Sequence, residues 1–276
     1  MDLVRASHLY KVFGKNERQV IERLKAGESR EELASLGTAA VIDVSFEVAK
    51  GETFVVMGLS GSGKSTLIRM INGLWSPSEG TVEVAGKVVS DMNDAQLRAL
   101  RRDHVSMVFQ HFALLPHLTV RENAAYGLKL QGKLKQKERL EKANEWLNTV
   151  GLNGWGDKYP HQLSGGMQQR VGLARALAAE TDILLMDEAS SALDPLIRRE
   201  MQDQLLELQG ALNKTIIFIT HDLNEAMYLG DHIAVMRNGR VAQIGTSDEI
   251  LTQPADEYVA DFDQDVDRSR VLTASA

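Results

Sequence analysis

A glycine-rich loop between an apolar strand pattern and a helical pattern constrains this chain more than any other feature. The loop spans residues 58–66, follows ETFVVM and runs into TLIRMINGL. Glycines let consecutive backbone N–H groups turn toward phosphate oxygens, and the following helix adds its positive end. Lys64 supplies charge for the β- and γ-phosphates, and Ser65 supplies a hydroxyl for magnesium. The loop predicts a nucleoside triphosphate site with contacts from Gly58, Ser60, Gly61, Ser62, Gly63, Lys64, Ser65 and Thr66.

Short apolar runs alternate with helical patterns along most of the chain, which predicts an α/β fold with a mainly parallel sheet. No run reaches the roughly 18 apolar residues of a membrane helix, and Asp2 argues against a secretory signal, so we expect a soluble chain. The predicted strands are Val41–Val48, Thr53–Gly58, Gly80–Val84, Val105–Phe109, Ile183–Asp187, Thr215–Ile219, Ile233–Met236 and Arg240–Ile244.

A charged insertion at residues 15–37 interrupts the alternation. It predicts two short helices separated near Gly27, with Ser29 and Glu32 forming a capping box for the second. A solvated surface insertion is the plainer interpretation. The apolar residues at helical spacing are Val20, Ile21, Leu24, Leu33 and Leu36.

A second interruption, residues 112–179, is helical almost throughout and predicts a helical subdomain inserted into the α/β core. Its expected helices lie near Val120–Gln131, Gln136–Val150 and Gly165–Ala179. The polar tail, residues 262–276, is expected to fray.

Composition narrows the class of partner and of cofactor. The chain has 276 residues, 31 Lys plus Arg, 38 Asp plus Glu and a net charge of −7. This balance gives no general electrostatic reason to bind nucleic acid or an anionic membrane surface. The absence of cysteine excludes disulfides, thiolate zinc sites and iron–sulfur clusters, and it fits a reducing compartment.

A second apolar strand, at residues 183–187, ends in two acids. Asp187 is expected on the magnesium side, where a second strand beside a phosphate loop delivers a carboxylate. Glu188 points to the opposite side and is a candidate to hold the attacking water.

The segment LSGGMQQR, residues 163–170, resembles the signature motif of ATP-binding cassette (ABC) ATPases. Its serine and glycines begin a helix, which offers a second set of N–H donors for phosphate. The resemblance covers essentially the whole chain, 1–276, and implies a single ABC ATPase domain. That domain has a P-loop NTPase (RecA-like) core with N-terminal antiparallel β-strands. In the family, the signature of one subunit meets the phosphate loop of the other across a dimer, which implies ATP contacts from Ser164, Gly165, Gly166 and Gln168.

The same resemblance implies roles for three isolated residues. Gln110, after the strand at 105–109, matches the glutamine that reaches magnesium and the attacking water. His221 matches the switch histidine that touches the γ-phosphate, and Asp194 matches a loop that communicates across the dimer. Asp194, followed by a proline, could equally be an ordinary helix N-cap. The implied catalytic residues are Glu188, His221 and Gln110, and the implied magnesium ligands are Ser65, Gln110 and Asp187.

Adenine usually stacks on an aromatic ring near the N-terminus of such a domain. Phe13 aligns with the family position, and Tyr10 is a competitor. The charged insertion that follows departs from the common pattern, and core packing is the alternative role for Phe13.

Several segments resemble ATPase subunits of bacterial importers for quaternary-amine osmoprotectants such as glycine betaine, proline betaine and choline. They are the KVFG turn with its insertion, GLSGSGKSTLIRMINGL, FALLPHLTVRENAAYGL and MDEASSALDPLIRREMQDQLLELQ. Ala189 follows the expected catalytic glutamate, as in that group, where most importers have proline. The pair of regulatory domains that many relatives append is not expected here.

This resemblance implies ATP and Mg²⁺ as ligands and a homodimer of ATPase subunits. It also implies integral membrane permease subunits as partners and, indirectly, a soluble substrate-binding protein, with no nucleic acid. The expected location is the cytoplasmic face of the bacterial inner membrane, as a peripheral subunit. The alternatives are an importer of amino acids or other small solutes and, less in keeping with the motifs, an ABC ATPase without a transport role.

Overall fold

The computed structural model describes residues 2–110, 112–188 and 195–262. The chain divides into two compact units, one of residues 1–97 with 217–276 and one of residues 98–216. Two elements contain the boundaries, α3 (Asp94–Asp103) and β8 (Thr215–Thr220). None of the helices in the described ranges is long and apolar enough to cross a membrane.

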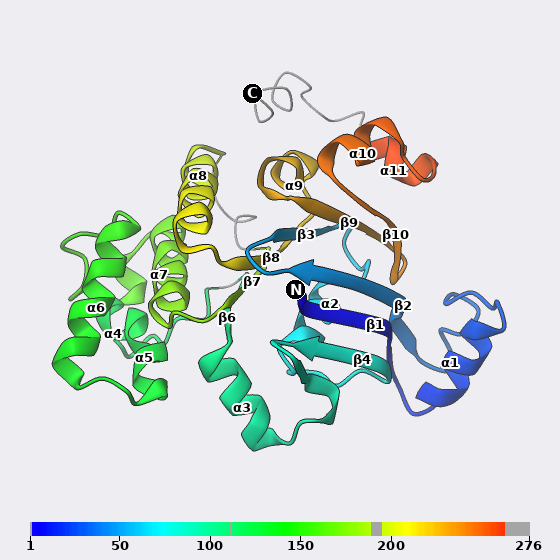
Figure 1. Ribbon diagram of the computed structural model, residues 1–276, viewed down its shortest axis with the longest axis horizontal. Helices are drawn as coiled ribbons and strands as arrows, with labels where there is room; N and C mark the ends of the chain where they lie inside the picture. The colour runs from blue at the N-terminus through cyan, green and yellow to red at the C-terminus, as the bar shows by residue number, and fades with distance from the viewer. Residues whose placement is uncertain (1, 111, 189–194, 263–276) are drawn as a thin grey trace. The chain divides into compact units, whose positions relative to one another are not determined.

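The first unit contains a four-stranded antiparallel sheet of order β2-β1-β4-β5. Figure 1 shows β1 between β2 and β4. β1 pairs with β2 and β4, and its register brings Val4 opposite both Val48 and Val84. Alternate residues of β2 are buried, as expected when one face of a sheet packs on the core. The strands are β1 (Asp2–Phe13), β2 (Thr38–Ala49), β4 (Glu79–Val84) and β5 (Lys87–Val88).

A second, mixed sheet has the order β10-β9-β3-β8-β7-β6, and in it β3 (Thr53–Met57) lies between β9 (His232–Arg237) and β8. β3 runs parallel to β9, and β10 (Arg240–Gly245) pairs antiparallel with β9. Every residue of β3 is buried, as expected of a central strand in which only Thr53 is polar. The helices of this unit are α1 (Glu17–Lys25), α2 (Lys64–Ile71), η1 (Val89–Asp91), α9 (Leu223–Leu229), α10 (Ser247–Thr252) and α11 (Glu257–Asp261).

The charged insertion forms one of its two predicted helices. α1 is present, but residues 30–36 form hydrogen-bonded turns instead of a second helix. The predicted capping box does form, because Ser29 N–H donates to the Glu32 carboxylate and Glu32 N–H donates to Ser29 Oγ, at 2.8 and 3.3 Å. Leu36 N–H and Gly37 N–H both donate to Leu33 O, at 2.9 and 3.2 Å, and β2 begins at Thr38, so the turns end before a helix can extend.

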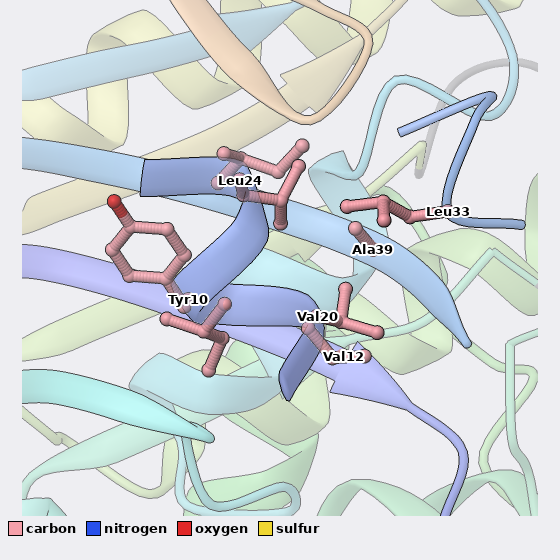
Figure 2. Packing of buried hydrophobic residues seen from close by; sticks show 8 residues of the cluster. Tyr10, Val12, Val20, Leu24, Leu33 and Ala39 are labelled. Carbon is pink, nitrogen blue, oxygen red and sulfur yellow. The ribbon is translucent and has the colours of Figure 1, made fainter. Parts of the chain in front are cut away.

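The apolar side of the insertion is buried, which corrects the interpretation of a merely solvated segment. Val20, Leu24 and Leu33 pack with Tyr10, Val12 and Ala39 of the antiparallel sheet (Figure 2). Ile21 and Ile42 belong to the same cluster, and Leu36 packs against it. The insertion therefore adds a small core to the end of the β1–β2 pair, and its charged residues form the outer face.

The second unit pairs β6 (Val105–Val108) parallel with β7 (Ile183–Asp187). The helix predicted over residues 120–131 is two helices, which meet at Ala125. Gly127 on the second of them lets Ala179 approach closely, since a Cβ there would lie 3.1 Å from the Ala179 Cβ. The helices are α4 (Val120–Ala124), α5 (Tyr126–Gln131), α6 (Gln136–Thr149), η2 (Pro160–Gln162), α7 (Gly165–Ala178) and α8 (Pro195–Leu212).

Candidate functional site

The glycine-rich loop connects β3 to α2 in the first unit, as predicted. Gly58, Gly61 and Gly63 have φ values of 149°, 77° and 104°, which favour glycine strongly. Two of them also leave no room for a side chain. A Cβ at Gly58 would lie 2.3 Å from Met236 O, and one at Gly63 would lie 2.2 Å from Ala40 O. The neighbouring strands therefore fix the path of the loop.

The inner side of the loop is polar and the outer side is open. The Lys64 side chain is only 4% exposed, and its Nζ donates to Gly58 O at 2.8 Å and Leu59 O at 3.1 Å. Ser62 Oγ is buried without a hydrogen-bond partner in the described structure. Ser60 and Gly61 are exposed, and a Cβ added at Gly61 would meet nothing within 4 Å.

These features fit a bound polyphosphate. A phosphate oxygen would give the Ser62 hydroxyl the partner that a buried polar group needs. The ammonium of Lys64, already held at the loop carbonyls, would give the phosphate a charge-assisted contact. Ser65 and Thr66 lie half-buried in the first turn of α2, at the positive end of the helix dipole.

The second unit brings two predicted catalytic residues together. Gln110, after β6, donates from Nε2 to Glu188 Oε2 at 3.1 Å. Glu188 directly follows the buried Asp187 at the end of β7. Glu188 has φ 47°, a backbone conformation that is uncommon for glutamate and recurs at functional sites. The hydrogen bond joins residues 78 positions apart, so the fold has assembled this pair.

The signature segment has the predicted capped helix start. Ser164 is the N-cap of α7, and its side chain accepts from Met167 N–H at 3.3 Å. Gly165 and Gly166 form the first turn, and Gln168 Nε2 donates to Leu163 O at 3.2 Å. The N-terminus of a helix of this length offers N–H groups and a positive dipole to an anion.

Sequence reasoning missed Arg175, which binds the segment after Gln110. Its guanidinium donates to Ala113 O at 2.7 Å and to Phe112 O at 3.0 Å. Both of those residues have positive φ values, 47° and 60°. Burial lowers the pKa of Arg175 from its usual value. The only sequence signal is a basic residue among the apolar residues of α7, which does not reveal its partners.

His221 follows β8 in the first unit and is exposed. The residues on either side of His221 are Thr220 and Asp222, and the sequence analysis did not single them out. Asp222 N–H donates to Thr220 Oγ1 at 3.0 Å, and the Asp222 side chain caps α9 by accepting from Asn224 N–H at 2.9 Å. The Thr220 hydroxyl donates to the buried carboxylate of Glu225. The sequence did carry a signal for this helix start, because Asp222 stands three residues before Glu225, the spacing of a capping residue and its partner.

Burial separates the two candidates for the adenine-stacking ring. Tyr10 is 5% exposed and packs into the insertion cluster, and its pKa is raised chiefly by this burial. Phe13 is 38% exposed, so part of its ring is available to a ligand. The structure therefore favours Phe13, and its contact with adenine stays a prediction.

The predicted site residues are divided between the units. The phosphate loop, Phe13 and His221 belong to the first unit, and Gln110, Asp187, Glu188 and the signature residues belong to the second. Ala189, Asp194 and residues 263–276 lie outside the described part of the chain.

A glycine-rich phosphate loop, a strand ending in two acids and a serine-capped signature helix define a nucleotide-binding cassette. The chain matches the ABC transporter family over residues 41–191, and it belongs to that family. It therefore binds ATP, and the prediction of an ABC ATPase is confirmed.

A solved structure agrees with this assignment. The dimeric post-hydrolysis state of the ATP-binding cassette MJ0796, bound to ADP and Pi, matches with a TM-score of 0.77 and 32% identity. The match covers 88% of this chain and 98% of that one. It confirms the predicted P-loop fold with N-terminal antiparallel strands and a helical subdomain. The boundaries 15–37 and 112–179 remain predictions.

Curated relatives confirm the predicted subfamily. The glycine betaine transport ATP-binding protein OpuAA of Bacillus subtilis is 55% identical over 98% of this chain and 65% of its own length. The glycine betaine/proline betaine transport protein ProV of Escherichia coli is 52% identical over 97% and 67%. The trimethylamine N-oxide transport protein TmoW of Ruegeria pomeroyi is 48% identical over 99% and 80%. The chain thus spans about two thirds of the length of the first two relatives.

Proposed function

We propose that this chain hydrolyses ATP to power import of a quaternary-amine osmoprotectant, such as glycine betaine, proline betaine or choline, through separate membrane subunits. The hydrogen bond from Gln110 to Glu188, directly after Asp187, carries the catalytic part of the proposal. The names of relatives at 48–55% identity support the substrate class, because the compounds in those names all carry a methylated nitrogen with a formal positive charge.

Each predicted site residue has a role in this proposal. Glu188 orients the attacking water, and its bond to Gln110 fixes the carboxylate for that task. Lys64, Ser164 and His221 stabilise charge on the phosphates. The remaining phosphate-loop and signature residues supply backbone N–H groups and hydroxyls, and Phe13 stacks on adenine.

Magnesium fits the donors that this chain provides. Mg²⁺ is usually held by one or two carboxylates together with phosphate oxygens and water, so one buried carboxylate, one hydroxyl and one amide suffice. Asp187, Ser65 and Gln110 are those donors. When bound, the ion would neutralise charge that develops on the β- and γ-phosphates.

The presence of two phosphate-binding segments in one chain supports a dimer. The phosphate loop and the signature helix each offer N–H groups to one nucleotide, and the solved relative is a dimer, which supports a homodimer with ATP held between subunits. Because the substrate would cross through permease subunits, this chain would act at the cytoplasmic face of the membrane. A soluble binding protein would contribute indirectly, and a net charge of −7 gives no reason to propose nucleic acid.

The catalytic role is tested with Glu188→Gln. The variant should lose ATP hydrolysis by about 10²- to 10⁴-fold while it keeps ATP affinity, because the amide cannot act as a base. Glu145→Gln on the exposed face of α6 is the matched control and should hydrolyse ATP normally. Undiminished hydrolysis by Glu188→Gln would refute the assigned role.

The substrate class is tested by transport. The chain is reconstituted into liposomes with the permease and binding protein of its organism that copurify with it, and ATP-dependent uptake of glycine betaine is compared with that of amino acids. Uptake should favour the quaternary amine, since aromatic cages recognise that group. A preference for amino acids or sugars would overturn the substrate assignment.

A further inference from the structure

Trp75 contacts the ring that is proposed to stack on adenine. The ring centroids of Phe13 and Trp75 lie 5.0 Å apart, and the ring planes meet at 77°, an edge-to-face arrangement. An edge-to-face contact stabilises two rings by more than the buried area alone accounts for, and it fixes one ring relative to the other. Trp75 has no assigned role, and it lies in sequence just after the helix that begins at the phosphate loop.

Trp75 is bound to the last turn of that helix, α2. The Leu74 and Trp75 N–H groups both donate to Arg69 O, at 2.9 and 3.0 Å. The Arg69 guanidinium also lies 4.9 Å from the centre of the Trp75 ring, within the range of a cation–π contact. The position of Trp75 is therefore tied to the helix that starts at Lys64.

The loop that carries Trp75 is also bound to the strand that carries Phe13. Lys11 Nζ donates to Ser76 O at 2.9 Å and lies 5.2 Å from the centre of the Phe13 ring. Ser78 N–H donates to Tyr10 O at 2.8 Å, and Val12 N–H donates to Ser78 Oγ at 3.1 Å. The segment from 74 to 78 thus holds β1 on both sides of Lys11.

The charged insertion reaches the same loop. The Ser78 hydroxyl donates to the carboxylate of Glu17, in the first turn of α1. Val20 and Leu24 of α1 belong to the same buried cluster as Val12, the residue before Phe13 (Figure 2). The insertion therefore contacts both the end of β1, which carries Phe13, and the loop from 74 to 78, which carries Trp75.

We propose that Trp75 is a positioning residue that holds Phe13 for the base, and that the insertion fixes its loop through the Glu17–Ser78 bond. The proposal rests on the proposed function in that Phe13 stacks on adenine. A half-exposed ring that moves freely loses rotamer freedom when it binds a base, and a ring fixed in advance does not. Because Trp75 is tied to α2, it sets the ring relative to the phosphate loop.

The first test separates base binding from phosphate binding. Trp75→Ala should weaken ATP binding by about 2- to 12-fold, the range expected for one aromatic pair, and should leave the affinity for tripolyphosphate unchanged. Trp75→Phe should restore most of the loss. Glu17→Gln should give a smaller loss in the same direction. The controls are Trp155→Phe in the second unit and Glu22→Gln, also on α1, and both should bind ATP normally.

A spectroscopic test does not depend on hydrolysis. With Trp146 and Trp155 replaced by phenylalanine, Trp75 is the remaining tryptophan, and its emission should change with ATP but not with tripolyphosphate. Equal loss of affinity for ATP and tripolyphosphate in Trp75→Ala, or no change in emission on ATP binding, would overturn the proposal. Failure of the unmodified chain to bind ATP would instead overturn the proposed function.

Discussion

Replacing Gly63 by alanine should destabilise the protein far more than replacing Gly61, although both glycines lie in the same loop. Both have positive φ values, 104° and 77°, so each alanine incurs a backbone penalty of about 1–2 kcal/mol. Alanine also lowers the entropy of the unfolded chain by a similar amount at either position. Both contributions are therefore similar in the two variants, and they drop out of the difference in stability between them.

The remaining difference comes from the space around each Cβ. At Gly61 the new methyl group meets nothing within 4 Å, and at Gly63 it would lie 2.2 Å from Ala40 O. That carbonyl belongs to β2, two residues before Ile42, whose N–H donates to Gly239 O at 2.8 Å. The strand must therefore shift by about 1 Å against its neighbours, which costs about 1–3 kcal/mol as an overpacked site.

The assay is urea unfolding of the nucleotide-free chain, followed by far-ultraviolet circular dichroism. After the unfolded-state entropy is subtracted, we expect Gly61→Ala to lose about 0–1.5 kcal/mol and Gly63→Ala about 1–4.5 kcal/mol, with similar dependence on urea concentration. Equal losses would refute the reasoning, because they would mean that the contact with Ala40 does not constrain the loop.

Three further predictions concern stability. Leu24→Ala should lower the free energy of unfolding by about 2–4 kcal/mol because Leu24 is buried in the insertion cluster, whereas Leu130→Ala, at a side chain 59% exposed, should change it by less than about 0.5. Asn123→Ala should lower the thermal midpoint, since the buried Asn123 amide donates to Leu115 O, Leu118 O and Thr119 O at 3.0–3.1 Å. The pKa of Glu122 is lowered because the Thr119 N–H and hydroxyl donate to its carboxylate, so its stabilising contribution is complete above the ordinary carboxyl pKa and is lost as the pH falls. Glu122→Gln should remove this pH dependence from the unfolding free energy, and an unchanged pH profile would contradict it.

The sequence predicted every strand from β2 to β10 except the two-residue β5, with ends within about three residues. β1 was predicted only through the family resemblance, because its alternation of buried and exposed residues breaks at His8, where φ is 49° and the register shifts between Ala6 and Leu9. The helix expected over 120–131 is broken at Ala125, and the second helix of the insertion is a series of turns. Periodicity indicates which side of a segment is apolar, but it does not fix where the chain must turn back to join its neighbours.

The site shows the same division. The phosphate loop, the acids at 187 and 188 and the capped start of α7 are contiguous segments, so their local sequence suffices to predict their backbone. The sequence left two rings open for adenine because burial depends on what packs over each one. Tyr10 lies under the insertion and Phe13 does not. Arg175 and Trp75 gave no usable signal, since their partners at 112–113 and 13 lie far away in the chain.

The sequence by itself thus determined the family and the positions of the strands along the chain, and it predicted the phosphate site, because each depends on neighbouring residues or on a pattern repeated along the chain. Tertiary structure alone decided that Gln110 bonds to Glu188 across 78 positions, that the apolar side of the insertion is covered, and that Phe13 keeps an exposed ring beside Trp75. The physical reason is that burial and side-chain hydrogen bonds between distant residues depend on how the whole chain packs.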